Sequence, residues 1–136
     1  MVNTIIIFIL ATGWPFLIIL SILIVKRGIS CHRKLKDTAL GKLVIPTMVM
    51  LEVYKHIRRH KGRDEALQAV AGMKQGEVQD LDERLALYAG ELGVEVGLPL
   101  ADSVILATSR LREATLWTQD SDFEGMEGVR FKRKRS

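Results

Sequence analysis

The sequence predicts an α/β domain of three layers, α/β/α, with a central parallel sheet. Its 136 residues suffice for one domain and are too few for two ordinary hydrophobic cores. From Leu43 onward, short apolar segments alternate with amphipathic helical segments, which is typical of a parallel sheet covered by helices. The single cysteine, Cys31, excludes an internal disulfide framework and a cysteine-rich zinc site. The sequence contains no glycine-rich phosphate loop and no GxSxG elbow. Its carboxylates are therefore the remaining candidates for catalytic chemistry.

The predicted elements follow from hydrophobic periodicity and from the residues that start and stop them. Leu43–Pro46 is apolar and ends at proline, which predicts a short strand. Thr47–His60 follows with a helical period, and Thr47 is its candidate N-cap. The same criteria predict three further helices, at Arg63–Met73, at Leu81–Val96 with Asp82 as candidate cap, and at Leu100–Glu113, and two further strands, at Thr115–Thr118 and Val129–Phe131.

The first 36 residues differ from the rest of the chain. Residues 4–25 carry no charged side chain and are long enough to cross a bilayer as a helix. The basic residues from Lys26 to Lys36 would then keep the remaining chain in the cytoplasm. A buried strand at Thr4–Leu10 explains the same apolar run equally well, and both interpretations stay open. We therefore expect a hydrophobic and then basic segment at 1–36, a domain at 37–131 and a basic tail at 132–136.

Four carboxylates occupy positions that favour a functional site. Glu52 lies within an apolar helical stretch, where an unpaired charge is unfavourable. Asp102 opens an apolar helix, and Asp120 and Asp122 directly follow a predicted strand, where the sites of parallel sheets gather. Acids held together repel one another unless a hard cation such as Mg²⁺ or Mn²⁺ binds them. Taken singly, each is also explained as a helix cap or turn residue or, for Glu52, as the partner of Lys55, Arg58 or Arg59.

Two long stretches of the chain resemble the PIN-domain family, and in particular its small VapC-type toxin ribonucleases. They read IPTMVMLEVYKHIRR and GLPLADSVILATSRLREATLWTQDSDFEGMEGVRF, and the resemblance spans Leu43 to Phe131. The second stretch is the more specific of the two. It contains a Leu-Ala-Asp helix start, an Ala-Thr within that helix, a strand ending Thr-x-Asp, an Asp-Phe pair and a final Gly-Val-Arg strand, in the order and at the spacing of the family.

This resemblance implies a PIN-like fold and a metal-dependent endoribonuclease. Glu52, Asp102 and Asp120 are similar in position to the family's catalytic and metal-binding acids, with Asp122 as an accessory metal ligand and Thr118 as a residue that orients Asp120 or a metal-bound water. The implied cofactor is Mg²⁺ or Mn²⁺, and the implied substrate is RNA. The implied partners are a protein antitoxin and a second copy of the chain. The implied location is the cytoplasm or, should residues 4–25 cross a membrane, a membrane-anchored domain that faces the cytoplasm.

One position departs from the family pattern. The family begins with a strand that leads into a metal-binding Asp, and with the Gly-Trp pair aligned this position is Leu10. No acidic residue occurs before Asp37. Loss of one carboxylate weakens metal binding, so weak or absent activity is expected. Four explanations stay open: a weakened enzyme, a non-catalytic binding protein of the same fold, a single-span membrane protein that recruits partners, and a shifted reading frame over residues 1–36.

Overall fold

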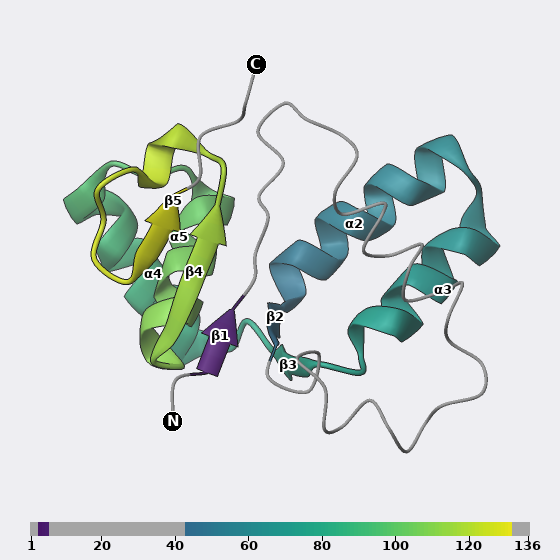
Figure 1. Cartoon of the computed structure of the whole chain (residues 1–136), viewed down its shortest axis with the longest axis horizontal. Coiled ribbons are helices and arrows are strands. Elements are labelled where there is room, and N and C mark those ends of the chain that lie inside the picture. Colours follow the sequence, from purple (N-terminus) through teal and green to yellow (C-terminus); the bar gives the residue numbers. More distant parts are fainter. Residues whose placement is uncertain (1–2, 6–42, 132–136) are drawn as a thin grey trace.

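The computed structural model describes residues 3–5 and 43–131 of the chain (Figure 1). The predictions for Leu10, for most of the apolar run at 4–25, for the basic segment up to residue 36 and for the tail at 132–136 lie outside these residues. The described elements, in chain order, are β1 (Asn3–Ile5), β2 (Val44–Pro46), α2 (Thr47–His60), α3 (Arg63–Met73), β3 (Glu77–Gln79), α4 (Glu83–Val96), α5 (Leu100–Leu111), β4 (Ala114–Thr118), the 3-10 helix η2 (Ser121–Phe123) and β5 (Val129–Phe131).

Every strand pair among the described residues is parallel, which confirms the predicted α/β class. β4 is the middle strand of a three-stranded sheet, with β1 on one side and β5 on the other. β2 and β3 form a second sheet of two strands. The two sheets approach one another where β1 lies next to β2 (Figure 1). Helix α5 contacts β4 of one sheet and β2 of the other, so it joins the two parts of the core.

Helices α2 and α3 form an antiparallel pair that begins and ends at the predicted residues (Figure 1). In α2, the buried residues Val49, Val53 and Ile57 recur every four residues and form one apolar face. The chain turns between the helices at Gly62, whose φ of 112° lies in a region that favours glycine. The strong periodicity and this glycine explain why the sequence predicted both helices correctly.

The predicted N-cap of α2 was wrong. Pro46 occupies the N-cap position, and Thr47 is the first helical residue. The Thr47 hydroxyl oxygen instead accepts a hydrogen bond from the backbone N–H of Leu81 at 3.2 Å. Thr47 therefore connects the start of α2 to the segment that precedes α4.

Strand β3 was not predicted, because its sequence, EVQ, places one apolar residue between two polar ones. The backbone N–H of Glu77 donates to the carbonyl of Leu43 at 2.8 Å, which extends the contact with the β2 segment. The polar side chains of β3 also have partners on the residue that follows α5. Arg112 forms an ion pair with Glu77 and donates a hydrogen bond to Gln79 Oε1 at 3.3 Å. These long-range partners stabilise a strand that has little hydrophobic signal of its own.

Both ends of the predicted third helix are set by capping residues. The candidate cap is confirmed: Asp82 Oδ1 accepts a hydrogen bond from the backbone N–H of Leu85 at 2.8 Å, so α4 begins at Glu83 rather than at the predicted Leu81. Helix α4 ends at Gly97, which adopts a left-handed φ of 78°. The next helix, α5, ends at Leu111 rather than at the predicted Glu113.

Two glycines of α4 provide a matched test of how this helix packs on α5. A Cβ atom added at Gly93 would lie 2.4 Å from Ser103 Oγ, whereas one added at Gly90 would meet no atom within 4 Å. Ser103 Oγ donates to the carbonyls of Pro99 and Leu98, at 2.8 and 3.2 Å, so it cannot move without weakening these bonds. We expect Gly93→Ala to lower the free energy of unfolding by about 1–3 kcal/mol. Gly90→Ala should raise it by about 0.5–1 kcal/mol, through helix propensity. Urea denaturation measures both, and equal effects would contradict the close packing at Gly93.

Several large apolar side chains are exposed on and next to α4. Val94 is 87% exposed and Leu87 is 66% exposed, and Leu100, at the start of α5, is 79% exposed. Within the described ranges, no helix taken alone has the length and hydropathy needed to cross a membrane. Helices α4 and α5 reach that length and hydropathy only as a pair, and they are bent by 111° relative to one another.

Candidate metal centre

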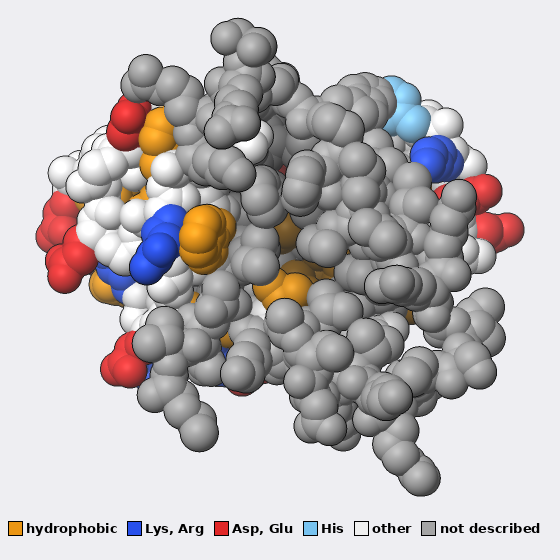
Figure 2. All heavy atoms as spheres, in the orientation of Figure 1, with side chains coloured by type: hydrophobic (Ala, Val, Ile, Leu, Met, Phe, Trp, Pro, Cys, Tyr) orange, Lys and Arg blue, Asp and Glu red, His pale blue; other side chains and the backbone are white. Residues whose placement is uncertain are grey.

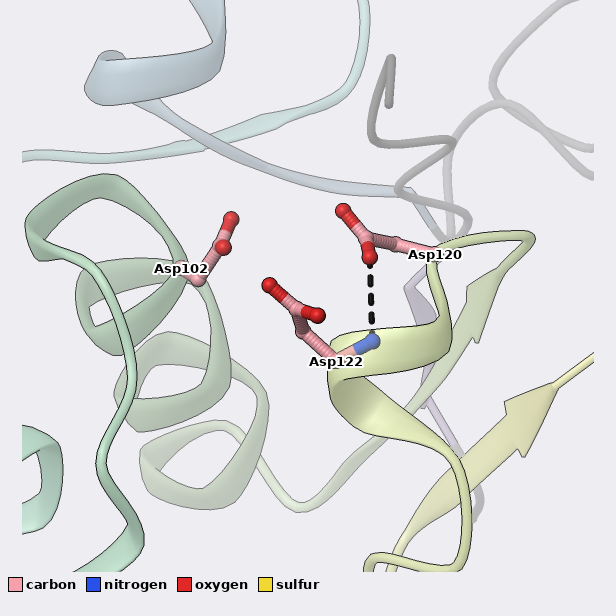
Figure 3. Close-up of side chains that lie close together, drawn as sticks. All are labelled: Asp102, Asp120 and Asp122. Atoms are coloured by element: carbon pink, nitrogen blue, oxygen red, sulfur yellow. Dashed lines mark hydrogen bonds between the residues drawn. The ribbon is translucent and has the colours of Figure 1, made fainter. Parts of the chain in front are cut away.

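Three aspartates from two elements lie together (Figure 3). Asp102 belongs to the first turn of α5, and Asp120 and Asp122 follow β4. One carboxylate oxygen from each of the three lies within 4.8 Å of the other two. Asp102 and Asp120 are 8% and 6% exposed, whereas Asp122 is exposed to solvent. The structure thus brings together three of the predicted acids at the carboxyl end of β4, where parallel sheets place their sites. We call these three residues the aspartate cluster.

A short hydrogen-bonded turn fixes two members of the aspartate cluster. The backbone N–H of Asp120 donates to the hydroxyl oxygen of Thr118, the last residue of β4, at 3.0 Å. The backbone N–H of Asp122 donates to Asp120 Oδ1, also at 3.0 Å, so Asp120 caps η2 (Figure 3). Phe123, the last residue of η2, is completely buried and anchors the turn in the core. Phe123 was not among the predicted site residues, although the Asp-Phe pair was part of the family pattern.

The carboxylates of the aspartate cluster repel one another when no cation is bound. Burial, together with the smaller effect of the negative charges of Asp120, Asp122 and Glu52, raises the pKa of Asp102 from 3.8 to about 6. Desolvation disfavours the ionised carboxylate, and each neighbouring carboxylate repels it. The cluster therefore has an electrostatic reason to bind a cation.

Glu52 lies beside the aspartate cluster rather than within it. Its charge raises the pKa of Asp102, so it is close enough to interact, yet it does not belong to the group of oxygens within 4.8 Å. Its side chain is exposed on α2. Partial desolvation raises the pKa of Glu52, and the neighbouring Lys55 acts in the opposite direction. The predicted roles of Glu52 as a catalytic residue and a metal ligand stay predictions.

The residues of the aspartate cluster fit a hard divalent cation. Such cations bind carboxylate oxygens at about 2.0–2.6 Å, so two ligands of one ion lie up to about 4–5 Å apart. The 4.8 Å limit of the aspartate cluster agrees with this separation. Asp102, Asp120 and Asp122 are therefore the residues that would hold a metal ion. The position of the family's first acid, Leu10, lies outside the described residues, so the fit rests on these three carboxylates.

Thr118 offers a test of how the turn positions Asp120. Its side chain is 1% exposed, and its hydroxyl accepts the Asp120 backbone N–H. We expect Thr118→Val to leave this N–H buried without an acceptor and to lower the free energy of unfolding by about 1–3 kcal/mol. Thr118→Ser keeps the hydroxyl and should retain the bond. Amide hydrogen exchange at Asp120, measured by NMR, should accelerate in the valine variant alone. Equal protection in both variants would contradict the positioning role of the hydroxyl.

The sequence of the chain matches a known protein family. A family model for the PIN domain matches residues 18–129. This match begins within the hydrophobic and then basic segment at residues 1–36, and the domain boundary at Asp37 stays a prediction. No curated protein sequence matches the chain.

Solved structures share its fold, among them the following three. One, a toxin–antitoxin complex from Klebsiella pneumoniae, has a TM-score of 0.58 and 24% identity, covering 64% of this chain and 71% of that chain. The DNA-bound VapBC of Salmonella typhimurium has a TM-score of 0.63 and 17% identity and covers 98% of both chains. VapBC2 of Rickettsia felis, bound to a DNA fragment from its promoter, has a TM-score of 0.56 and 16% identity, over 83% of this chain and 92% of that chain.

The family match and the fold agree with the resemblance found in the sequence. The match includes all of the described helices and the strands from β2 to β4. It also includes the aspartate cluster, which lies at the end of β4. The match covers residues 18–129, which is much more than half of the chain. The parallel strands are those of an α/β fold. The protein therefore belongs to the PIN domain family.

Proposed function

We propose that this protein is a metal-dependent endoribonuclease of the PIN type and the toxin of a toxin–antitoxin pair. The observation that carries this proposal is the aspartate cluster, in which two buried carboxylates and one exposed carboxylate meet within 4.8 Å. A purely structural role does not explain it, because three adjacent carboxylates without a cation oppose one another. Metal-dependent phosphodiester hydrolysis uses such a group of acids.

The three carboxylates have different surroundings, which suit different tasks. Asp102 and Asp120 are buried and would hold a cation from the protein side, while the exposed Asp122 would bind it at the solvent edge, where a substrate enters. A bound Mg²⁺ or Mn²⁺ would stabilise negative charge on the phosphodiester and lower the pKa of the attacking water. Glu52 adds negative charge from α2, and Lys55 beside it offers a cation to a substrate phosphate.

The partners of the chain are also part of the proposal. The three similar structures are named as a toxin–antitoxin complex or as VapBC assemblies, which supports a protein antitoxin as a partner. RNA as the substrate, a homodimer and a cytoplasmic location follow from the family resemblance. A membrane anchor at residues 4–25 would instead keep the chain with membranes through a high-pH carbonate wash.

The experiment that tests the proposal is cleavage of a structured RNA by the purified chain. We expect cleavage with Mn²⁺ and none with EDTA, because the metal supplies the Lewis acid. A Leu10→Asp variant is assayed beside it to restore the family's first acid. Cleavage by this variant alone would support the assignment of the site and identify the natural chain as a disabled copy. Absence of cleavage by both would overturn the nuclease proposal.

A second candidate function is favoured by one observation, the leucine at position 10. A PIN-fold protein without its first acid can retain its binding surfaces while losing turnover. Tight binding of RNA or of an antitoxin without metal-dependent cleavage, in both the natural chain and the Leu10→Asp variant, would favour this non-catalytic role over the enzyme.

A further inference from the structure

The junction of α2 and α3 carries the densest positive charge of the described residues. We call Arg58, Arg59, Lys61 and Arg63 the basic tip. All four side chains are exposed, and within the part of the chain that the structure describes no ion pair involves any of them. Figure 2 shows histidine and basic side chains at this edge of the molecule, where α2 ends and α3 begins, with acidic side chains nearby. The basic tip is a charged surface that the aspartate cluster does not explain.

The ordinary explanation for basic residues at a helix end is compensation of the helix dipole. The C-terminus of α2 carries a partial negative charge of about one half, and Arg58 and Arg59 lie in its last turn. The N-terminus of α3, however, lies at the same junction and carries a partial positive charge of similar size. The two ends therefore largely cancel. Asp64 and Glu65, in the first turn of α3, offset part of the side-chain charge and leave a net +2 over residues 58–65. This surplus of positive charge exceeds what is needed to compensate the two helix dipoles.

Two imidazole rings lie next to these cations. His56 and His60 are one turn apart on α2, with ring centroids 4.7 Å apart and planes tilted by 44°. Desolvation lowers the pKa of His56, and the positive charges of His60 and Arg59 lower it further, so that ring is mainly neutral at neutral pH. Proteins bind single-stranded RNA with exposed cations, which contact the phosphates, and with nearby aromatic rings, which stack on the bases. The basic tip and the two histidines provide both residue types.

Helix α2 connects this surface to the metal centre. It packs against α5, which carries Asp102 in its first turn. Glu52 lies in the second turn of α2, and Lys55 follows it one turn later. From Glu52 to Lys61 the helix rises by roughly 14 Å. We infer that the basic tip binds the backbone of an RNA strand at nucleotides outside the cleaved bond, with the strand running along α2. This inference rests on the proposed nuclease function and assigns to it a second RNA-binding surface.

The test measures RNA binding by full-length protein in which Asp102→Asn prevents cleavage. In this background, Arg58, Arg59 and Lys61 are replaced together by glutamine. The control replaces three other exposed basic residues, Lys74, Arg84 and Arg110, with the same change in net charge. Fluorescence anisotropy with a labelled single-stranded oligonucleotide gives the Kd over a range of salt concentrations. A dinucleotide serves as a ligand too short to reach the basic tip.

Replacement of these three residues of the basic tip should raise the Kd for the oligonucleotide roughly tenfold at low salt. It should also reduce the slope of log Kd against log salt by about 2, since each phosphate contact of a single strand contributes about 0.7. The control variant and the dinucleotide should show neither effect. An equal loss in both triple variants would mean general charge attraction and would overturn the inference, and so would unchanged binding. These binding measurements require no cleavage. Their outcome is therefore independent of the result of the nuclease assay.

Discussion

Asp102→Asn is expected to reduce Mn²⁺-dependent RNA cleavage about a hundredfold or more while the chain stays folded. Asp102 is buried in the first turn of α5, and its carboxylate is one of the three that would hold the cation. Removal of a residue that only supports a metal ligand typically weakens metal binding or activity by about 10–100-fold, and removal of a ligand should have a larger effect. Asparagine has nearly the same shape, so packing should be retained. Initial rates over a series of Mn²⁺ concentrations measure the effect.

A matched variant separates this effect from a change in net charge. Glu91 is exposed on α4 and is not among the groups that raise the pKa of Asp102. Glu91→Gln therefore removes one negative charge without touching the aspartate cluster, and its cleavage rate should stay close to that of the natural chain. If Asp102→Asn cleaves as fast as Glu91→Gln, the aspartate cluster is not the catalytic centre.

The second prediction concerns stability without metal. The pKa of Asp102 is about 6 in the folded chain and 3.8 as its ordinary value. The folded state therefore binds the proton more tightly than the unfolded state does. Stability must then fall as the pH rises from about 4 to above 6. One pKa unit corresponds to about 1.4 kcal/mol, and solvent screening reduces the total loss to about 1–2 kcal/mol. Urea denaturation at a series of pH values, with EDTA present, measures this loss.

The variant Asp102→Asn isolates the contribution of this one group, because asparagine does not titrate. The variant and the natural chain should be similar in stability near pH 4, and the variant should be the more stable of the two above pH 6. Mn²⁺ added above pH 6 should stabilise the natural chain, by about 2.7 kcal/mol at a hundred times its Kd. A difference in stability between the two proteins that does not change with pH would refute the electrostatic argument.

Much of the fold was predictable because its helices carry strong local signals. The bounds of α2 and α3 were predicted correctly, since α2 has a clear apolar face and Gly62 marks the turn between the helices. Strand β3 was missed because its stability comes from distant partners, the Leu43 carbonyl and Arg112. Thr47 was wrongly predicted as an N-cap because the sequence does not show that Leu81 would compete for its hydroxyl. Local pattern predicts local structure, and contacts between distant segments override it.

The candidate site was predictable in its parts but not in its geometry. The position of Asp120 after a strand and of Asp102 at a helix start indicated a common edge, and the structure places the two together with Asp122. Sequence alone did not distinguish the three clustered acids from Glu52, because the distance of α2 from the end of β4 depends on how α2 packs on α5. The buried environment that raises the pKa of Asp102 likewise depends on tertiary packing.

Binding of Mn²⁺ to the purified chain, followed by electron paramagnetic resonance above pH 6, tests the aspartate cluster most directly, because it does not depend on a substrate. The natural chain and Glu91→Gln should each bind one equivalent of Mn²⁺ with similar affinity. Asp102→Asn should bind it at least about tenfold more weakly. Equal Mn²⁺ binding by all three proteins, or none by the natural chain, would contradict the assignment of Asp102, Asp120 and Asp122 as a metal centre.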